Sequence, residues 1–182
     1  MAAPLTGRSL AVVLVAAFLG MATWAAVHFT PGKEIPQVNH RAPDYRVARL
    51  PNGDSVALRS GNAGHVTLIN IWATWCGPCV KEMPSMERLY QAYRDRGFRV
   101  AAVSIDTDLP APVLAFARRL GLSFDIMHDR SGEIQTYFMT VGVPESFLVD
   151  KRGVITYIAL GAEEWDSPEN RQRIERLLAA GD

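Results

Sequence analysis

Hydrophobic and polar residues follow short alternating patterns along most of the chain, but the N-terminus contains one long apolar run. From Ser9 to Val27 the sequence has 19 residues without a charge. A helix rises about 1.5 Å per residue, so a run of this length spans roughly the ~30 Å hydrocarbon core of a bilayer. The pattern predicts a transmembrane helix at residues 9–27.

Charges around this run predict its orientation. Arg8 directly precedes it, whereas Lys33 and Arg41 follow at a distance. Positive charge close to a span tends to stay in the cytoplasm, so we expect a cytoplasmic segment at residues 1–8 and an exported remainder. The run exceeds the usual ~7–15 residues of a signal-peptide core, which favours an uncleaved anchor. If the chain is bacterial, the anchor lies in the inner membrane and the exported part in the periplasm or at the cell exterior.

The next segment, residues 28–43, is rich in proline, glycine and polar residues and is predicted to be a linker. A single domain is expected at residues 44–182. Its first two apolar runs, 45–50 and 54–58, surround Pro51-Asn52-Gly53, and this arrangement predicts a β-hairpin.

The next elements alternate between strand and helix. Residues 66–72, VTLINIW, form a nearly continuous apolar run, which is typical of a central strand buried on both faces. Helical sequence follows at about 77–94, with Pro84 expected to kink it. The remaining elements are predicted as strands at 98–105, 125–128, 146–150 and 154–160, and helices at 112–120, 133–138 and 168–179. Because the last two strands are joined by a short turn, they pair antiparallel, and we predict an α/β fold with a mixed sheet and helices on both faces.

Composition narrows the classes of function. The chain has 182 residues, and its 19 basic residues balance 19 acidic ones, so the overall charge does not favour nucleic acid as a partner. The sequence holds two cysteines, Cys76 and Cys79, which are too few for a scaffold of structural disulfides or a four-thiolate zinc site.

The two cysteines lie at a predicted strand-to-helix junction, a position that favours a reactive thiolate. Trp75-Cys76-Gly77-Pro78-Cys79 lies between the predicted central strand and the following helix. A thiolate at a helix N-terminus is stabilised by backbone N–H groups and by the helix dipole, which favours Cys76 as the attacking nucleophile. Cys79 lies one turn later, where it can close a disulfide and act as the resolving thiol.

The stretch INIWATWCGPCVKEMP resembles the active site of the thioredoxin superfamily, especially its membrane-anchored TlpA/ResA/CcmG-like branch. Ala42-Pro43-Asp44 before the hairpin, Pro84 in the helix and Gly142-Val143-Pro144 before a strand extend the resemblance. It implies a thioredoxin-like three-layer fold with an N-terminal β-hairpin extension. It also implies a protein-disulfide oxidoreductase that uses a redox-active Cys76–Cys79 disulfide and no other cofactor or metal.

The resemblance also assigns substrate-binding residues. Val143-Pro144 is expected to be a cis peptide packed against the cysteines, where an extended substrate segment can hydrogen-bond to exposed backbone groups. Trp75 is expected to form the apolar rim around Cys76.

One departure from thioredoxin concerns proton transfer. Thioredoxin usually has a buried aspartate six residues before its first cysteine, whereas this chain has Asn70, which cannot titrate. Glu82 lies three residues after Cys79 on the same helical face and is the candidate proton acceptor. Glu145, beside Pro144, is a second acid/base candidate, and Trp165 has no assigned role.

The branch that the chain resembles consists mainly of reductases. They receive electrons from a membrane thiol donor and reduce protein disulfides during cytochrome c maturation or assembly of a copper site in an oxidase. The sequence leaves two alternatives open: a disulfide-donating oxidase, and a copper-binding chaperone-like module in which His128 is the plausible further ligand.

Overall fold

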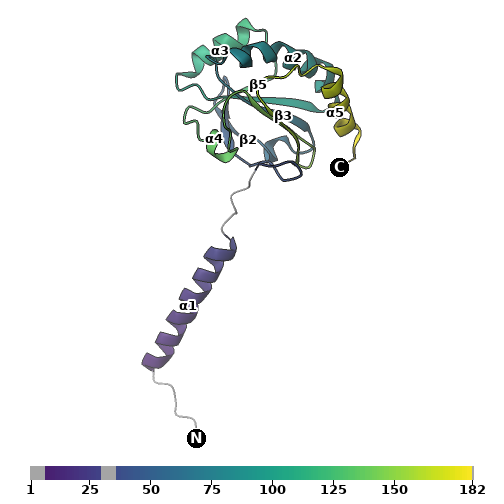
Figure 1. Cartoon of the computed structure of the whole chain (residues 1–182). Coiled ribbons are helices and arrows are strands. Elements are labelled where there is room, and N and C mark those ends of the chain that lie inside the picture. The colour runs from purple at the N-terminus through teal and green to yellow at the C-terminus, as the bar shows by residue number, and fades with distance from the viewer. Residues whose placement is uncertain (1–6, 30–35, 182) are drawn as a thin grey trace. The chain divides into compact units, whose positions relative to one another are not determined.

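The computed structural model describes residues 7–29 and 36–181 and divides the chain into two units, Met1–Lys33 and Glu34–Asp182. The first unit contains helix α1 (Gly7–Phe29), which includes the apolar run at 9–27 (Figure 1). Among the described residues, no helix meets the combined length and apolarity required to cross a membrane. Residues 1–6 of the predicted cytoplasmic segment and 30–35 of the predicted linker lie outside the described residues.

The second unit is built on a seven-stranded sheet with the order β2-β1-β5-β4-β3-β6-β7. Its strands are β1 (Arg46–Arg49), β2 (Asp54–Ala57), β3 (Val66–Trp72), β4 (Phe98–Ser104), β5 (Asp125–His128), β6 (Glu145–Val149) and β7 (Ile155–Leu160). The strands β3, β4 and β5 are parallel, and every other neighbouring pair is antiparallel. The prediction of a mixed sheet and an opening hairpin is therefore confirmed.

Helices cover both faces of this sheet, as predicted. They are α2 (Gly77–Tyr93), α3 (Pro110–Arg119), α4 (Ile134–Tyr137) and α5 (Pro168–Ala179), with short 3-10 helices η1 (Ser60–Asn62) and η2 (Arg94–Arg96). The crossovers β3-α2-β4 and β4-α3-β5 step in one direction along the sheet, so their right-handedness places α2 and α3 on one face. Figure 1 shows α5 on this side as well, and α4 on the other.

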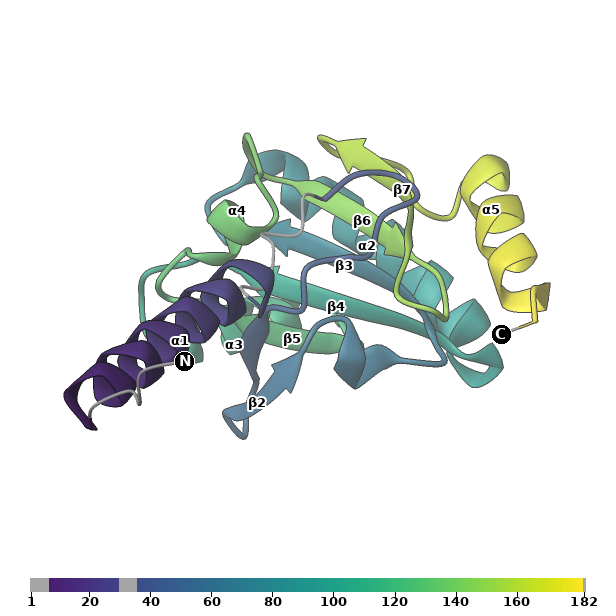
Figure 2. The same ribbon diagram turned by 90° about the horizontal axis from the view of Figure 1, so that it is seen from below.

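Strand β3 is the centre of the core and the support of the active-site helix. All seven of its residues are buried between β4 and β6, as the continuous apolar run predicted. Figure 2 shows these three strands side by side. The chain leaves β3 at Trp72 and enters α2 at Gly77, with Pro78 in the first turn, where a missing N–H costs no helical hydrogen bond. Pro84 lies inside α2, which continues to Tyr93.

Residues 39–42 of the predicted linker hydrogen-bond to the second unit, at strand β7 and the turn before it. Asn39 donates its backbone N–H to the Ile155 carbonyl at 2.8 Å, and Ile155 donates in turn to His40 at 2.9 Å. Ala42 donates to Gly153 at 2.9 Å and is fully buried. Strand β7 is at the sheet edge, where its outer backbone groups need partners, so residues 39–42 belong to the second unit.

Candidate functional site

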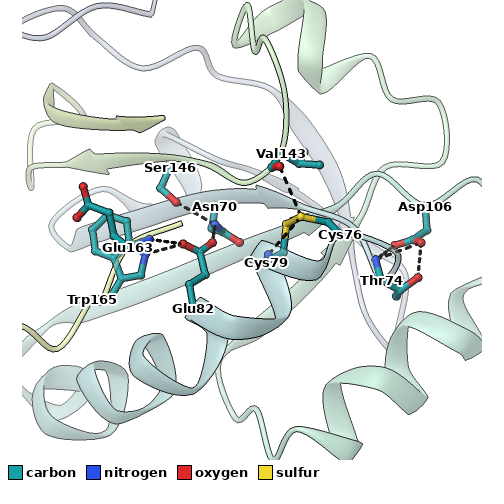
Figure 3. Close-up of a disulfide and its surroundings, with 10 residues drawn as sticks. All are labelled: Asn70, Thr74, Cys76, Cys79, Glu82, Asp106, Val143, Ser146, Glu163 and Trp165. Carbon is teal, nitrogen blue, oxygen red and sulfur yellow. Dashed lines mark hydrogen bonds between the residues drawn. A yellow bond between two sulfur atoms is a disulfide. The ribbon is translucent and has the colours of Figure 1, made fainter. Parts of the chain in front are cut away.

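The cysteine pair forms a disulfide at the start of α2 (Figure 3). Cys76 is the N-cap residue of the helix, and the backbone N–H of Cys79 donates to Cys76 Sγ at 3.2 Å. Cys76 is 5% exposed, whereas Cys79 is fully buried. A donor N–H and the positive end of the helix dipole both favour a thiolate at Cys76, and this sulfur is the more accessible one.

The loop before β6 lies directly against Cys76. The Val143–Pro144 peptide is cis, as the family resemblance implied. The carbonyl oxygen of Val143 lies 3.5 Å from Cys76 Sγ, a distance at which the reduced thiol can donate to it. Pro144 is buried, and its carbonyl accepts the Gly161 N–H at 2.9 Å, which ties the loop to the end of β7. Trp75 is 68% exposed at the surface beside Cys76.

A small cavity of about 190 Å³ opens beside this loop. It is lined by Val141, Gly142, Val143, Pro144, Glu145, Leu160 and Gly161. Val141 and Leu160 are exposed apolar residues at its margin. The sequence-predicted docking residues Val143 and Pro144 therefore line a partly apolar recess next to Cys76.

Glu82 is buried under the disulfide, with 2% of its surface exposed. Its carboxylate accepts three hydrogen bonds: from Asn70 Nδ2 at 2.8 Å to Oε1, and from Glu163 N–H at 3.1 Å and Trp165 Nε1 at 3.2 Å to Oε2 (Figure 3). Burial raises the pKa of Glu82 to about 7, while the three donors act in the opposite direction. A carboxyl with such a pKa can accept and release a proton at neutral pH.

Asn70 connects Glu82 to the rest of the core. It is fully buried, and its side-chain amide nitrogen also donates to Ser146 Oγ at 2.8 Å. The sequence showed only that Asn70 cannot titrate. Its position on β3, facing α2, makes it a neutral hydrogen-bond donor to the titrating group.

Glu145 lies on the opposite side of the sheet from Asn70. In the β3–β6 pairing, Ser146 is opposite Asn70, whereas Glu145 is opposite Ile71. Neighbouring residues of a strand point to opposite faces, so Glu145 does not join the Glu82 network. Glu145 is 5% exposed; burial raises the pKa of this carboxyl, and the Val141 N–H that donates to it at 3.1 Å lowers it in part.

Two contributors to the Glu82 network come from the segment before α5. Trp165 is fully buried and donates its indole N–H, and Glu163 donates its backbone N–H. The sequence marked Trp165 as unexplained and did not single out Glu163. No local pattern could have found them, because they lie 83 and 81 residues from Glu82.

A second buried carboxylate supports the loop that precedes Cys76. Asp106 accepts the Thr74 backbone N–H at 3.0 Å, the Thr74 hydroxyl at 2.6 Å and the Ser104 hydroxyl at 2.6 Å. Sequence reasoning missed Asp106, although a signal was present. It follows β4, and the carboxyl ends of the parallel strands β3 and β4 meet at one edge of the sheet.

His128, the further ligand in the copper-binding alternative, is engaged elsewhere. It is 5% exposed, and its Nε2 lies 2.7 Å from the Asp106 carbonyl oxygen, which identifies Nε2 as the N–H donor. Within residues 7–29 and 36–181, no three or more His, Cys, Asp or Glu side chains are grouped as a metal site.

Comparison with known proteins matches the chain to one family and to thioredoxin-like relatives. The Redoxin family model matches residues 32–178. The thiol-disulfide oxidoreductase ResA of Oceanobacillus iheyensis is 33% identical over 139 residues, covering 75% of this chain and 71% of that protein. The thioredoxin-like protein YneN of Bacillus subtilis is 34% identical over 155 residues, covering 84% and 89%.

Solved structures resemble the second unit closely. A Chlorobium tepidum protein assigned as a thiol:disulfide interchange protein DsbE superposes with a TM-score of 0.71 at 29% identity, covering 79% of this chain and 99% of that one. The crystal structure of StoA from Bacillus subtilis, at 24% identity, has a TM-score of 0.56 over 71% of this chain and 92% of that one, which shows the shared fold.

Proposed function

Because the chain belongs to the Redoxin family and is a ResA-type thiol–disulfide oxidoreductase of the thioredoxin superfamily, we propose that it reduces protein disulfides outside the bacterial cytoplasm. The observation that carries the proposal is the Cys76–Cys79 pair at the start of α2, with the buried carboxyl of Glu82 beneath it.

In the proposed reaction the reduced protein transfers two electrons to its substrate. The Cys76 thiolate attacks a substrate disulfide, forms a mixed disulfide and releases the first substrate thiolate. Glu82 accepts the proton of Cys79, whose thiolate then attacks Cys76 Sγ in the mixed disulfide. This second exchange releases the other substrate thiolate, which is protonated, and closes the Cys76–Cys79 disulfide.

The proposed substrate is a folded or unfolded protein that presents a disulfide in an extended segment. Val143, Pro144 and the adjacent recess accommodate that segment, while the exposed indole of Trp75 covers its apolar side chains. Apocytochrome c and a copper-site protein of an oxidase are the substrate types that the family resemblance suggests.

Each turnover oxidises the cysteine pair, so a dithiol donor must reduce it again. A membrane thiol carrier fits this role, because the surroundings outside the cytoplasm generally oxidise thiols. Direct thiol–disulfide exchange between that carrier and Cys76 would return the two electrons.

An N-terminal anchor in the inner membrane completes the proposal. Support comes from the uncharged run at 9–27 and from large apolar side chains that α1 exposes on several sides: Val13, Leu14, Val15, Phe18, Leu19, Met21 and Trp24. A tether would keep the redox site near a membrane donor and raise their effective concentration. Recovery of the intact chain in washed membranes, and its release after deletion of residues 1–29, would test the anchor.

The reduction potential of Cys76–Cys79 tests the direction of the reaction. We expect equilibration in graded thiol–disulfide buffers to yield a value near or below the ~−270 mV typical of thioredoxin. A value near the ~−120 mV of a strong disulfide donor would overturn the proposal and favour the oxidase. Failure to form the disulfide would favour the copper-binding alternative.

A further inference from the structure

The loop between β7 and α5 supplies two of the three donors that reach the buried carboxylate of Glu82. The Glu163 N–H and the Trp165 indole N–H both donate to Oε2, at 3.1 Å and 3.2 Å. We propose that Trp165 is a positioning residue of the redox reaction, whose indole N–H holds the Glu82 carboxylate in the ionised form that accepts the Cys79 proton. This inference rests on the proposed role of Glu82.

Burial makes the indole hydrogen bond important. Trp165 is fully buried and Glu82 is 2% exposed. In such a site the charged carboxylate depends on protein donors for the stabilisation that water would otherwise provide. Removing one donor therefore favours the protonated carboxyl, which cannot accept a proton from Cys79.

The segment that carries the indole, residues 163–166, contacts α2 at three positions on one helical face, 82, 85 and 88. The Trp165 backbone N–H donates to Ser85 Oγ at 2.9 Å, and this hydroxyl donates to the Glu82 carbonyl at 2.7 Å. One turn later, Arg88 pairs with Glu164 at 2.8 Å and also with Asp166. The loop thus presents the indole N–H to Glu82 in a defined orientation.

The groups around Glu82 include a second carboxylate, whose negative charge disfavours ionisation of Glu82, and the hydrogen-bond donors act against it. Cys79 lies one turn before Glu82 on α2, and Asn70, which is neutral, donates to it from β3. The Glu163 carboxylate, held by Tyr157 and Asn170, is a like charge that raises the pKa of Glu82. Burial raises it most; the Glu163 backbone N–H, the Asn70 amide and the Trp165 indole N–H all donate to the carboxylate and lower the pKa.

A second tryptophan provides a matched control. Trp72 on β3 is also fully buried, and its indole nitrogen has no hydrogen-bond partner among the described residues. It packs against Phe116 at a ring-centroid distance of 5.3 Å. Trp72→Phe therefore removes a buried indole N–H with no carboxylate bond, whereas Trp165→Phe removes the one that binds Glu82.

The test measures Glu82 ionisation directly in the full chain. We expect a carboxyl-carbon NMR titration of Trp165→Phe to move the Glu82 midpoint upward by about one pH unit, the shift expected for one lost hydrogen bond to a carboxylate. The acidic limb of the disulfide-reduction rate should move by the same amount. Trp72→Phe should leave both midpoints unchanged.

A surface variant provides an independent test if Trp165→Phe fails to fold. Arg88→Gln removes the ion pairs with Glu164 and Asp166 that hold the loop and should produce a smaller upward shift. Unchanged midpoints in folded Trp165→Phe and in Arg88→Gln would overturn the inference. A shift in Trp72→Phe equal to that in Trp165→Phe would also overturn it. Failure of the proposed role of Glu82 as proton acceptor gives a different result: Glu82→Gln would keep the wild-type rate profile, although Trp165→Phe still shifted the Glu82 titration.

Discussion

The side-chain amide of Asn70 on β3 donates a 2.8 Å hydrogen bond to Oε1 of Glu82 on α2. The two residues lie 12 positions apart, on either side of the cysteine pair in sequence, and both are buried. An amide donor favours the ionised carboxylate without competing for its proton. This pairing leaves Glu82 as the titrating member of the network beneath the disulfide.

Asn70→Asp should replace this neutral donor with a competing acid. Two carboxyls within hydrogen-bond reach share a proton, so one apparent pKa of the pair should rise by more than about one unit. The rate of disulfide reduction at neutral pH should fall, and its acidic limb should move to higher pH. Ser146→Ala, which removes the other acceptor of the Asn70 amide without adding a charge, is the control. An unchanged pH profile in Asn70→Asp would contradict the prediction.

Glu82 should make the oxidised protein less stable as pH rises. Its pKa is raised from 4.5, the ordinary value, to about 7 in the folded protein. The free energy of unfolding is therefore highest, as far as Glu82 is concerned, below pH 4.5, and it falls as pH rises through 7, because the folded state disfavours the ionised carboxylate. The expected loss is about 3 kcal/mol of unfolding free energy. Urea denaturation of the oxidised protein at pH 4 and pH 9 measures it, since disulfide-bonded cysteines do not titrate.

Glu82→Gln should reduce this pH dependence. Glu145→Gln is the companion variant, because burial also raises the pKa of Glu145. Ionisation of Glu145 therefore also lowers the free energy of unfolding as pH rises, and the variant measures that share. A wild-type slope in Glu82→Gln would show that Glu82 is not responsible.

Cys79→Ser should trap the substrate. With Cys76 as attacking thiol and no resolving thiol, the mixed disulfide between Cys76 and the substrate should accumulate. Mass spectrometry of the non-reduced protein measures the covalent adduct. Cys76→Ser, the matched variant, should form almost none, because Cys79 is fully buried. Equal adduct formation by both variants would contradict the assignment of roles.

Asp106→Asn should loosen the loop before Cys76. The amide is neutral and has one oxygen in place of two, so one of the two hydroxyls must stop donating and accept the amide N–H instead, and the hydrogen bonds lose their charged acceptor. We expect a loss of about 1–3 kcal/mol in unfolding free energy, measured by urea denaturation. Asp108→Asn, at an exposed position of the segment between β4 and α3 that also contains Asp106, should change stability by less than about 0.5 kcal/mol. Equal effects of the two variants would refute the role of Asp106.

Trp75→Ala should separate substrate binding from stability. Trp75 is 68% exposed, so its removal should change unfolding free energy by less than about 0.5 kcal/mol. The value of kcat/KM for a protein disulfide should fall several-fold, while that for a small disulfide should change little. Leu109→Ala, also exposed but in the segment before α3, controls for the loss of apolar surface. A parallel loss in both variants would argue against a local rim at Cys76.

Much of the fold follows from local patterns. The residue bounds of β5 and α5 coincide with the predicted strand at 125–128 and helix at 168–179. Alternation and periodicity report which side of an element is buried, and turn residues such as Gly53, with φ of 77°, mark where the chain reverses. Residues 39–42 have a loop-like composition, which predicts a linker, while their structure depends on pairing with the distant strand β7.

The sequence alone determined where the redox chemistry resides, because Cys76 and Cys79 need only a strand-to-helix junction and a spacing of one helical turn. It also singled out Glu82 by helical spacing. Only the tertiary structure decided how Glu82 titrates, by burying it and bringing Asn70, Glu163 and Trp165 to its carboxylate. The physical reason is that a carboxyl pKa depends on desolvation and on hydrogen-bond donors, and these arise from segments that meet only when the chain folds.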